Sequence, residues 1–407
     1  MTRCALFDDS ARSAFFPFTY SRPLSELRFG ILTLTEKWEA ELGQELSWLT
    51  VPYLRDKFPV GPELPELIIN GRSLPDRTLL EEIGGLNEGE GLLCGDFLLA
   101  AKPKENDPES LLKHYDEGGV DSLCSSLRLK ASSSDPDASL LHRKWELFNR
   151  NGEALREDHE RLKKKRSSAA LSSDNALIGD HLFLEKGVNI RHATLNTESG
   201  PIYIDRDAEV MEGAMIRGPF YLGPHAVVKM GAKIYGPTTV GPYCKVGGEV
   251  NNSLFFGYSN KAHDGFLGNS VIGEWCNLGA DTNNSNLKNN YGAVKVWDHQ
   301  KGSYETSGLT FCGIFMGDHS KCGIDTMFNT GTTVGFSANI FDAGFPPKFL
   351  PSFFWGGSGG GVPFELEKAK EVAEKMRERR GLPFDATEER IFDAVYRSTA
   401  VERQGME

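Results

Sequence analysis

Aliphatic residues recur at every sixth position between residues 204 and 246. They are Ile204, Val210, Ile216, Leu222, Val228, Ile234, Val240 and Val246. Four positions after each of the first seven stands a small residue, with Phe220 as the one exception. A period of six is neither the 3.6 of an α-helix nor the 2 of a single β-strand. It predicts a coil of short parallel strands with a corner every six residues, in which each coil stacks its inward side chains on the next.

The same period continues in three further segments. Their inward positions are Ile178, Leu184 and Ile190, then Phe266, Ile272 and Leu278, then Met316, Cys322, Phe328, Val334 and Ile340. The segments are separated by breaks at 196–201, after Val246, and at 283–308, and the last break is expected to form a loop or hairpin. A β-sandwich would show a period of two with turns every eight to twelve residues or so, and a right-handed β-helix has longer, less regular coils. The strict period of six fits neither.

Short apolar runs separated by a helical pattern fill the chain from its start to Lys130. The candidate strands are Cys4 to Phe7, Leu46 to Val51, Leu67 to Ile69 and Leu92 to Ala101, and residues 31–42 have helical periodicity. This alternation favours a mostly parallel sheet in an α/β domain, whose ligand site lies at the carboxyl ends of its strands. Asp8, Arg22 and Asn70 fall near such ends. Ordinary turns and caps are the competing interpretation of these side chains.

A linker and several helices flank the repeat. Residues 131–140 have linker composition, and the charged segment 144–165 is expected to be helical. After the repeat, a passage rich in Pro and aromatic residues is expected to cover the open end of the coil, followed by a Gly-rich hinge at 356–361 and two helices. The expected domains are therefore an α/β domain (1–140), a helical linker (141–175), the coil (176–345), and a C-terminal wrap with helices (346–407).

The charge and cysteine content narrow the function classes. The 407 residues carry a formal net charge of -12, whereas nucleic-acid binding normally needs a basic face. The seven cysteines form no Cys-x-x-Cys pair, so neither a disulfide framework nor a zinc site is indicated. Acidic residues stand where a signal peptide would need an apolar run, and no stretch approaches a membrane span. We therefore expect a cytoplasmic protein with neither nucleic acid nor membrane as its partner.

The densest polar stretch of the repeat, residues 259–291, contains His263. His263 falls outside the inward positions, which we assign to Phe266 and the residue two before it, so it is expected to face outward. A histidine can accept a proton near neutral pH, as an amine requires before it attacks a thioester. Asn277 is also expected to face outward, and Lys288 suits a phosphate. An ordinary surface histidine is the competing interpretation.

This stretch resembles the acetyltransferase half of the bifunctional bacterial N-acetylglucosamine-1-phosphate uridyltransferases. The β-helix of that family carries a Ser-Lys-Ala-Gly-His segment followed by Asn-x-Gly-Ala-Gly-Thr. Here the matching segments are Ser259 with Lys261-Ala262-His263, and Asn277-Leu278-Gly279-Ala280-Asp281-Thr282. The resemblance implies a left-handed parallel β-helix, acetyl-CoA as acyl donor, and a homotrimer.

The resemblance also implies roles for individual residues. His263 is the expected general base, and Glu249 is the acidic residue that assists it. Asn277 and Asn286 are expected to line the sugar and acyl-donor site, with Lys288 as the phosphate partner. Cys312 and Thr330 are assigned to the acyl-donor site.

Further motifs are similar to one branch of this family, the alternative uridyltransferase-acetyltransferase fusion proteins of several bacterial groups. They include Leu6-Phe7-Asp8-Asp9, Ser21-Arg22-Pro23, Asn70-Gly71-Arg72 and Gly317-Asp318-His319-Ser320. The branch implies nucleotidyl transfer to a sugar 1-phosphate, with Arg22 and Asn70 as substrate-binding residues and Asp96 as the Mg²⁺ ligand. Ordinary uridyltransferases have a Gly-x-Gly-Thr-Arg loop after the first strand. Here Asp8-Asp9-Ser10-Ala11-Arg12 stands in its place.

The leading hypothesis is an enzyme of sugar-nucleotide biosynthesis. It would transfer an acetyl group from acetyl-CoA to glucosamine 1-phosphate and a nucleotidyl group to the sugar 1-phosphate, giving a product of the UDP-N-acetylglucosamine type. The alternatives are a non-catalytic sugar-nucleotide-binding or scaffold protein, and a nucleotidyltransferase with a different sugar or base. A β-helical carbonic anhydrase would need three histidines around one zinc ion, and His225, His263 and His319 are too unevenly spaced.

Overall fold

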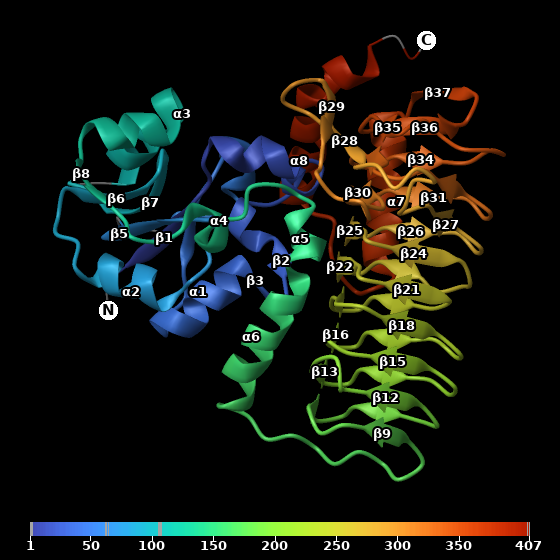
Figure 1. The fold of residues 1–407 in the computed structure, drawn as a ribbon. Coiled ribbons are helices and arrows are strands. Elements are labelled where there is room, and N and C mark those ends of the chain that lie inside the picture. The colour runs from blue at the N-terminus through green and yellow to red at the C-terminus, as the bar shows by residue number, and fades with distance from the viewer. Residues whose placement is uncertain (1–2, 62, 64, 105–107, 405, 407) are drawn as a thin grey trace. The chain divides into compact units, whose positions relative to one another are not determined.

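The computed structural model describes residues 3–61, 63, 65–104, 108–404 and 406. They form two compact units. The first contains the described residues within 1–15, 21–27 and 32–144, and the second contains those within 16–20, 28–31 and 145–407. The first unit is an α/β domain, and the second is a left-handed parallel β-helix with accompanying helices (Figure 1).

The first unit is built on a six-stranded sheet of order β4-β1-β5-β7-β6-β8. Its strands are β1 (Cys4–Phe7), β4 (Ser47–Leu49), β5 (Leu67–Asn70), β6 (Glu90–Cys94), β7 (Phe97–Lys102) and β8 (Arg128–Ala131). β1 pairs in parallel with β4 and β5, and β6 pairs in parallel with β8. The mostly parallel α/β sheet is therefore confirmed.

The run from Leu92 to Ala101 is two strands, and its prediction as one strand was wrong. β6 and β7 pair antiparallel, with Cys94 opposite Phe97. Between them Gly95 takes a φ of +58°, in the left-handed region that glycine adopts without a steric penalty. The tight turn at Gly95 and Asp96 reverses the chain, and as a result β7 is also antiparallel to β5.

Within its described residues, the α-helices of the first unit are α1 (Leu34–Leu42), α2 (Arg77–Gly84), α3 (Pro108–Ser125) and α4 (Pro136–Ser139). α1 starts with a capping box, in which the Thr33 side chain accepts from the Glu36 amide and the Glu36 carboxylate accepts from the Thr33 amide. It ends at Gly43, whose φ is +68°. Trp38 of α1 is fully buried and donates to the Ser73 carbonyl at 3.0 Å.

The β-helix has three faces, along which short parallel strands stack as in Figure 1. Face 1 comprises β10 (Leu182–Leu184), β13 (Ile202–Ile204), β16 (Phe220–Leu222), β19 (Thr238–Val240), β22 (Leu254–Gly257), β25 (Val271–Glu274), β30 (Phe315–Met316), β33 (Thr333–Val334) and β35 (Phe349–Leu350). Face 2 comprises β11 (Asn189–Ile190), β14 (Glu209–Val210), β17 (Val227–Val228), β20 (Lys245–Val246), β23 (Asn260–Lys261), β26 (Asn277–Leu278), β31 (Lys321–Cys322), β34 (Asn339–Ile340), β36 (Phe354–Gly357) and β37 (Gly360–Pro363). Face 3 comprises β9 (Ala176–Ile178), β12 (Thr194–Asn196), β15 (Met215–Arg217), β18 (Lys233–Tyr235), β21 (Glu249–Asn251) and β24 (Phe266–Gly268), with β27 (Asn283–Asn284) and β32 (Met327–Phe328) as a separate pair.

The eight aliphatic positions of the sixfold run all point into the β-helix. Each is at most 2% exposed, and the residues four positions after the first seven are also buried. On face 2, Val228 pairs with Val210 on one side and with Val246 on the other, so each coil leads from one inward aliphatic position to the third one after it. Three hexads therefore make one coil, and the inward side chains of each face form a column.

The break in the period after Val246 is a set of shortened coils. Full coils of three hexads would pair Val246 with Asp264 and Val250 with Gly268. The observed partners come earlier in the chain: Lys261 pairs with Val246, and Leu267 pairs with Val250. The inward residue of β24 is accordingly Leu267, which is 1% exposed, whereas Phe266 is half-buried. The assignment of Phe266 to the interior was wrong because it assumed that the period kept its length.

The last predicted break carries a hairpin, as expected. β28 (Lys295–Asp298) and β29 (Ser303–Thr306) pair antiparallel. The Gly-rich segment 356–361 is not a hinge, because β36 and β37 form a second antiparallel hairpin there. The helices of this unit are α5 (Glu146–Asn149), α6 (Asn151–Lys163), α7 (Leu366–Glu378) and α8 (Ala386–Ser398). α7 buries Ala369 and Ala373, and Gly381 follows it with a φ of +67°.

The inward column predicts that replacing neighbouring residues has very different effects on the free energy of unfolding. Ile216 is 2% exposed, whereas Met215 beside it is 49% exposed. Ile216→Ala leaves a cavity between packed coils, so we expect a loss of roughly 2–5 kcal/mol in the free energy of unfolding. Met215→Ala should change it by about 0.5 kcal/mol or less. Urea denaturation followed by circular dichroism measures both, and equal effects would contradict the inward assignment.

Candidate functional site

Asp8 lies at the carboxyl edge of the sheet in the first unit and bonds to three surrounding segments. Its carboxylate accepts hydrogen bonds from the Leu24 amide at 2.7 Å and the Thr50 hydroxyl at 2.6 Å. It also pairs with Arg12 at 3.2 Å. Burial raises the pKa of Asp8, and the Arg12 guanidinium and the Thr50 hydroxyl oppose this rise. Since its oxygens are engaged within the protein, Asp8 holds the local structure together.

Asp9, Asn70 and Arg72 form a second buried group at the same edge. The Asp9 carboxylate accepts from Arg72 Nε at 2.8 Å and from the Asn70 amide at 2.9 Å. The Asn70 amide also donates to the Leu98 carbonyl at 2.9 Å. The Arg72 side chain is fully buried, lies 4.5 Å from the centre of the Phe97 ring, and has no acceptor for Nη2 among the described residues. The group links the ends of β1, β5 and β7.

The other nucleotide-site candidates lie in the same unit. Arg22 is 5% exposed, and Asp96 is exposed in the turn between β6 and β7. A short 3₁₀ helix, residues Ser10–Phe15, occupies the place of the glycine-rich loop. No group of three or more metal-binding side chains occurs within the described ranges. Mg²⁺ is often held by one or two carboxylates together with substrate phosphates, and Asp96 is a single exposed carboxylate of the kind that such a site uses.

His263 lies at the corner where the chain passes from face 2 to face 3, between β23 and β24. The side chain is exposed, as expected. It lines a cavity of about 480 Å³. The other lining residues are Lys229, Met230, Gly248, Ala262, Asp264, Ala280 and Asp281. The corner therefore offers one imidazole, two carboxylates and the ammonium of Lys229 around a cavity that opens to solvent.

Lys261 supports the His263 corner from inside the β-helix. It takes an inward position, in register with Val246, and is 1% exposed. Its Nζ donates to the carbonyl of His263 at 2.6 Å and to that of Asp264 at 3.1 Å. Burial lowers the pKa of Lys261 to about 8, while Asp264 and Asp281 act in the opposite direction. The Lys261 ammonium thus holds the backbone of His263 and Asp264 in place through two hydrogen bonds.

Glu249 and Asn277 do not line the His263 cavity. Glu249 lies on β21 and accepts a hydrogen bond from the Tyr235 hydroxyl. Asn277 lies on the outside of face 2, in register with Asn260 and Lys321.

Asn286, Lys288, Cys312 and Thr330 gather at a different corner, between faces 3 and 1. The Cys312 amide donates to the Asn286 carbonyl at 2.8 Å, and the Cys312 carbonyl accepts from the amide of Gly331, the residue after Thr330, at 3.1 Å. The Asn286 side chain donates to Asn269 at 2.8 Å, and Lys288 Nζ donates to the Ala293 carbonyl at 2.5 Å. The structure brings these four residues together at the base of the β28–β29 hairpin.

Lys261 and Asp281 are parts of the site that the sequence pattern does not predict. Lys261 could have been found by allowing a coil shorter than three hexads after Val246, but the length of a coil becomes known only from strand pairing. Asp281 stands in the matching motif and reaches the cavity because its corner stacks on that of Asp264, whose carbonyl accepts the Asp281 amide at 3.2 Å.

The sequence model of one known family matches the N-terminal part of the chain. Residues 4–167 match the sequence model of the family described as "Sugar nucleotidyl transferase", a match that ends before β9 and supports a transferase. The comparison with curated proteins gives no match.

The solved structures that match this chain include an acetyltransferase and an acyltransferase. The polySia-specific acetyltransferase NeuO is 11% identical over 51% of this chain and 100% of its own, with a TM-score of 0.30. The UDP-N-acetylglucosamine acyltransferase of Arabidopsis is 13% identical over 58% of this chain and 93% of its own, with a TM-score of 0.21. Likeness at this level carries no conclusion about activity. Separately, no helix within the described part of the chain is long and apolar enough to cross a membrane.

The buried ammonium of Lys261 predicts a pH dependence of stability. Its pKa is about 8 in the folded chain against 10.5 for an ordinary lysine, so the unfolded chain binds more protons between these values. The free energy of unfolding should therefore rise as the pH increases from about 8 to 10.5. Lys261→Met, which suits the aliphatic column, should remove this part of the rise.

Urea denaturation at pH 8 and pH 10 measures the effect, with Lys233→Met at an exposed position as the control. An identical pH dependence in the wild type and Lys261→Met would contradict the buried charge.

Proposed function

We propose that the chain is an enzyme of sugar-nucleotide biosynthesis whose β-helix transfers an acetyl group from acetyl-CoA to an amino sugar 1-phosphate. The observation that carries this proposal is His263, exposed in a cavity at a corner whose backbone is held from inside by Lys261. A base that must meet a substrate needs an exposed ring on a fixed support. We choose glucosamine 1-phosphate as the acceptor because the motifs around His263 resemble those of the acetyltransferase family described above.

In the proposed reaction, His263 removes a proton from the sugar ammonium group. The free amine attacks the thioester carbonyl carbon of acetyl-CoA, so that a C–N bond forms and the C–S bond breaks. The nitrogen loses a second proton as the C–S bond breaks, and the leaving thiolate of coenzyme A takes up one proton. The products are the N-acetyl sugar 1-phosphate, the free thiol and the proton that His263 releases to solvent. Asp264 and Asp281, which line the same cavity, attract the positively charged ammonium group of the sugar phosphate before the proton is removed.

The role of His263 as general base predicts a loss of acetyl transfer when this residue is replaced. His263→Ala should lower the rate of thiol release from acetyl-CoA in the presence of glucosamine 1-phosphate by roughly 10²- to 10⁴-fold. The control is His192→Ala, because His192 is exposed at the same corner of a lower coil, between β11 and β12. Release at the wild-type rate by His263→Ala would refute the assignment.

The first unit is proposed to transfer a nucleotidyl group to the sugar 1-phosphate. The match of residues 4–167 to the sugar nucleotidyl transferase family supports this half. The carboxyl edge of its sheet offers Arg22 for a phosphate, and Asp96 for Mg²⁺ together with the nucleotide. When bound, the metal ion would neutralise the triphosphate. The residues of the chain would orient the sugar phosphate against the α-phosphorus, and pyrophosphate would leave.

Asp96 predicts a change in metal dependence. Asp96→Asn should raise the Mg²⁺ concentration needed for half-maximal pyrophosphate release from UTP and N-acetylglucosamine 1-phosphate by roughly tenfold, because one charged ligand is lost. Glu88→Gln, at another exposed position of the first unit, should leave it unchanged. An unchanged Mg²⁺ requirement in Asp96→Asn would remove this residue from the site.

A further inference from the structure

Five aromatic rings form a stack along the corner between faces 1 and 2. They are His225, Tyr243, Tyr258, Trp275 and His319, and we call them the aromatic ladder. All five residues have a φ between 53° and 61°, in the left-handed region. The ring centroids of Tyr258 and Trp275 are 4.3 Å apart, and their planes differ by 8°. One ring per coil, each in the same backbone conformation, gives this corner a regular aromatic wall.

The C-terminal end of α7 packs on the aromatic ladder. The Arg377 guanidinium lies 5.4 Å from the centre of the Trp275 ring. Arg380 Nη2 donates to the Tyr243 carbonyl at 3.4 Å. These contacts fix the last turn of α7 over the outer side of face 2, and this places the neighbouring Arg379 there as well.

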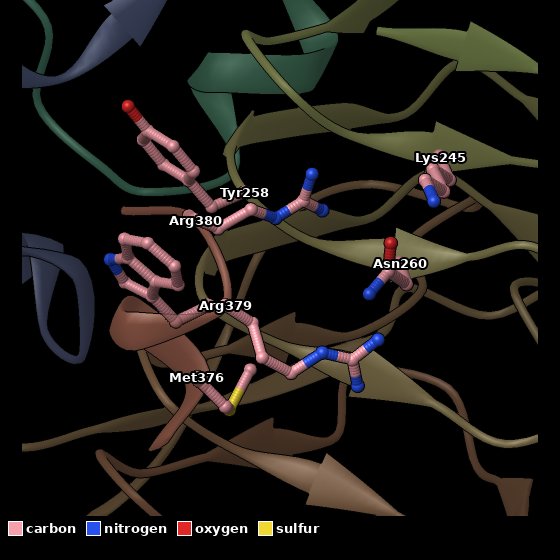
Figure 2. Close-up of a pocket in the computed structure, with 7 residues that line it drawn as sticks. Lys245, Tyr258, Asn260, Met376, Arg379 and Arg380 are labelled. Carbon is pink, nitrogen blue, oxygen red and sulfur yellow. The ribbon is translucent and has the colours of Figure 1, made fainter. Parts of the chain in front are cut away.

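A cavity of about 190 Å³ lies between α7 and the ladder (Figure 2). Its lining residues are Lys245, Tyr258, Asn260, Trp275, Met376, Arg379 and Arg380. Figure 2 shows the cationic ends of Lys245, Arg379 and Arg380 around the amide of Asn260. No acidic side chain lines the cavity, and within the described part of the chain none of these three cations forms an ion pair. Three positive charges around a small cavity favour an anion.

Asn260 supplies the second element of recognition. Its side-chain oxygen Oδ1 is buried and has no hydrogen-bond donor among the described residues. An unsatisfied buried carbonyl oxygen is costly, and a ligand that donates a hydrogen bond to it would remove this cost. The cavity therefore combines three positively charged side chains with one unsatisfied hydrogen-bond acceptor, Asn260 Oδ1.

We propose that this cavity binds a small organic phosphate, whose phosphate group meets Lys245, Arg379 and Arg380 and whose hydroxyl or N–H donates to Asn260 Oδ1. It lies at the corner between faces 1 and 2, whereas His263 lies at the corner between faces 2 and 3. It is therefore a second site, and its occupation does not depend on the proposed acyl transfer. A stacked aromatic wall and a helix end that carries two arginines suit a ligand that is held in one orientation.

Isothermal titration calorimetry on the full chain tests the site with three probes: glucose 1-phosphate, AMP and sulfate. The wild type should bind at least one phosphate ester. Lys245→Gln and Arg379→Gln should each weaken this binding by about tenfold or more, because each loses a charge-assisted hydrogen bond. Lys186→Gln, an equal change of charge at an exposed position of a lower coil, should not.

Asn260→Ala separates the two elements of recognition. It should weaken binding of the phosphate ester and leave binding of sulfate, which has no donor, unchanged. Tighter binding of glucose 1-phosphate identifies a sugar phosphate as the ligand, and tighter binding of AMP identifies a nucleotide. Absence of binding by both esters, equal losses in Lys245→Gln and Lys186→Gln, or an Asn260→Ala variant that binds the ester like the wild type would each overturn the proposal.

Discussion

The stacking of inward side chains between successive coils is the constraint on which the β-helical unit depends. A single coil buries almost nothing, and only the column that runs through the neighbouring coils removes its aliphatic side chains from water. The coils must also approach closely at their corners. At Gly241 a Cβ atom would lie 1.8 Å from the Phe256 carbonyl oxygen, so no other residue fits there. Packing between coils thus fixes both the period and the corner residues.

Because the column is apolar, a lysine inside it is costly and needs hydrogen-bond partners. Lys261 occupies a position where the coils on either side carry the aliphatic residues Val246 and Leu278, and burial disfavours its charge. Its ammonium is satisfied by two carbonyls of the corner that bears His263. The fold thus accepts a buried charge at one point of its core, where it orders the backbone of an exposed corner.

The three faces of the β-helix are uniform, whereas its three corners differ from one another. Strand residues alternate between the column and solvent, which leaves little freedom on the faces themselves. The corners can vary in length and backbone conformation. Shortened coils form the His263 corner, left-handed residues carry the aromatic ladder, and the β28–β29 hairpin leaves the third corner.

The sequence by itself determined the repeat, the direction of its inward positions from Ile204 to Val246, the α/β class of the first unit, and the outward exposure of His263. These follow from local periodicity and from local turn chemistry. Only the tertiary structure decided the inward residue of β24, the place of Lys261, and the grouping of Asn286 with Cys312 rather than with His263. The convergence of Lys245 and Asn260 with the end of α7 also became visible only in three dimensions. Each of these depends on the length of a coil, or on how a distant helix packs against it. Strand pairing and packing settle those quantities, and residue spacing along the chain does not.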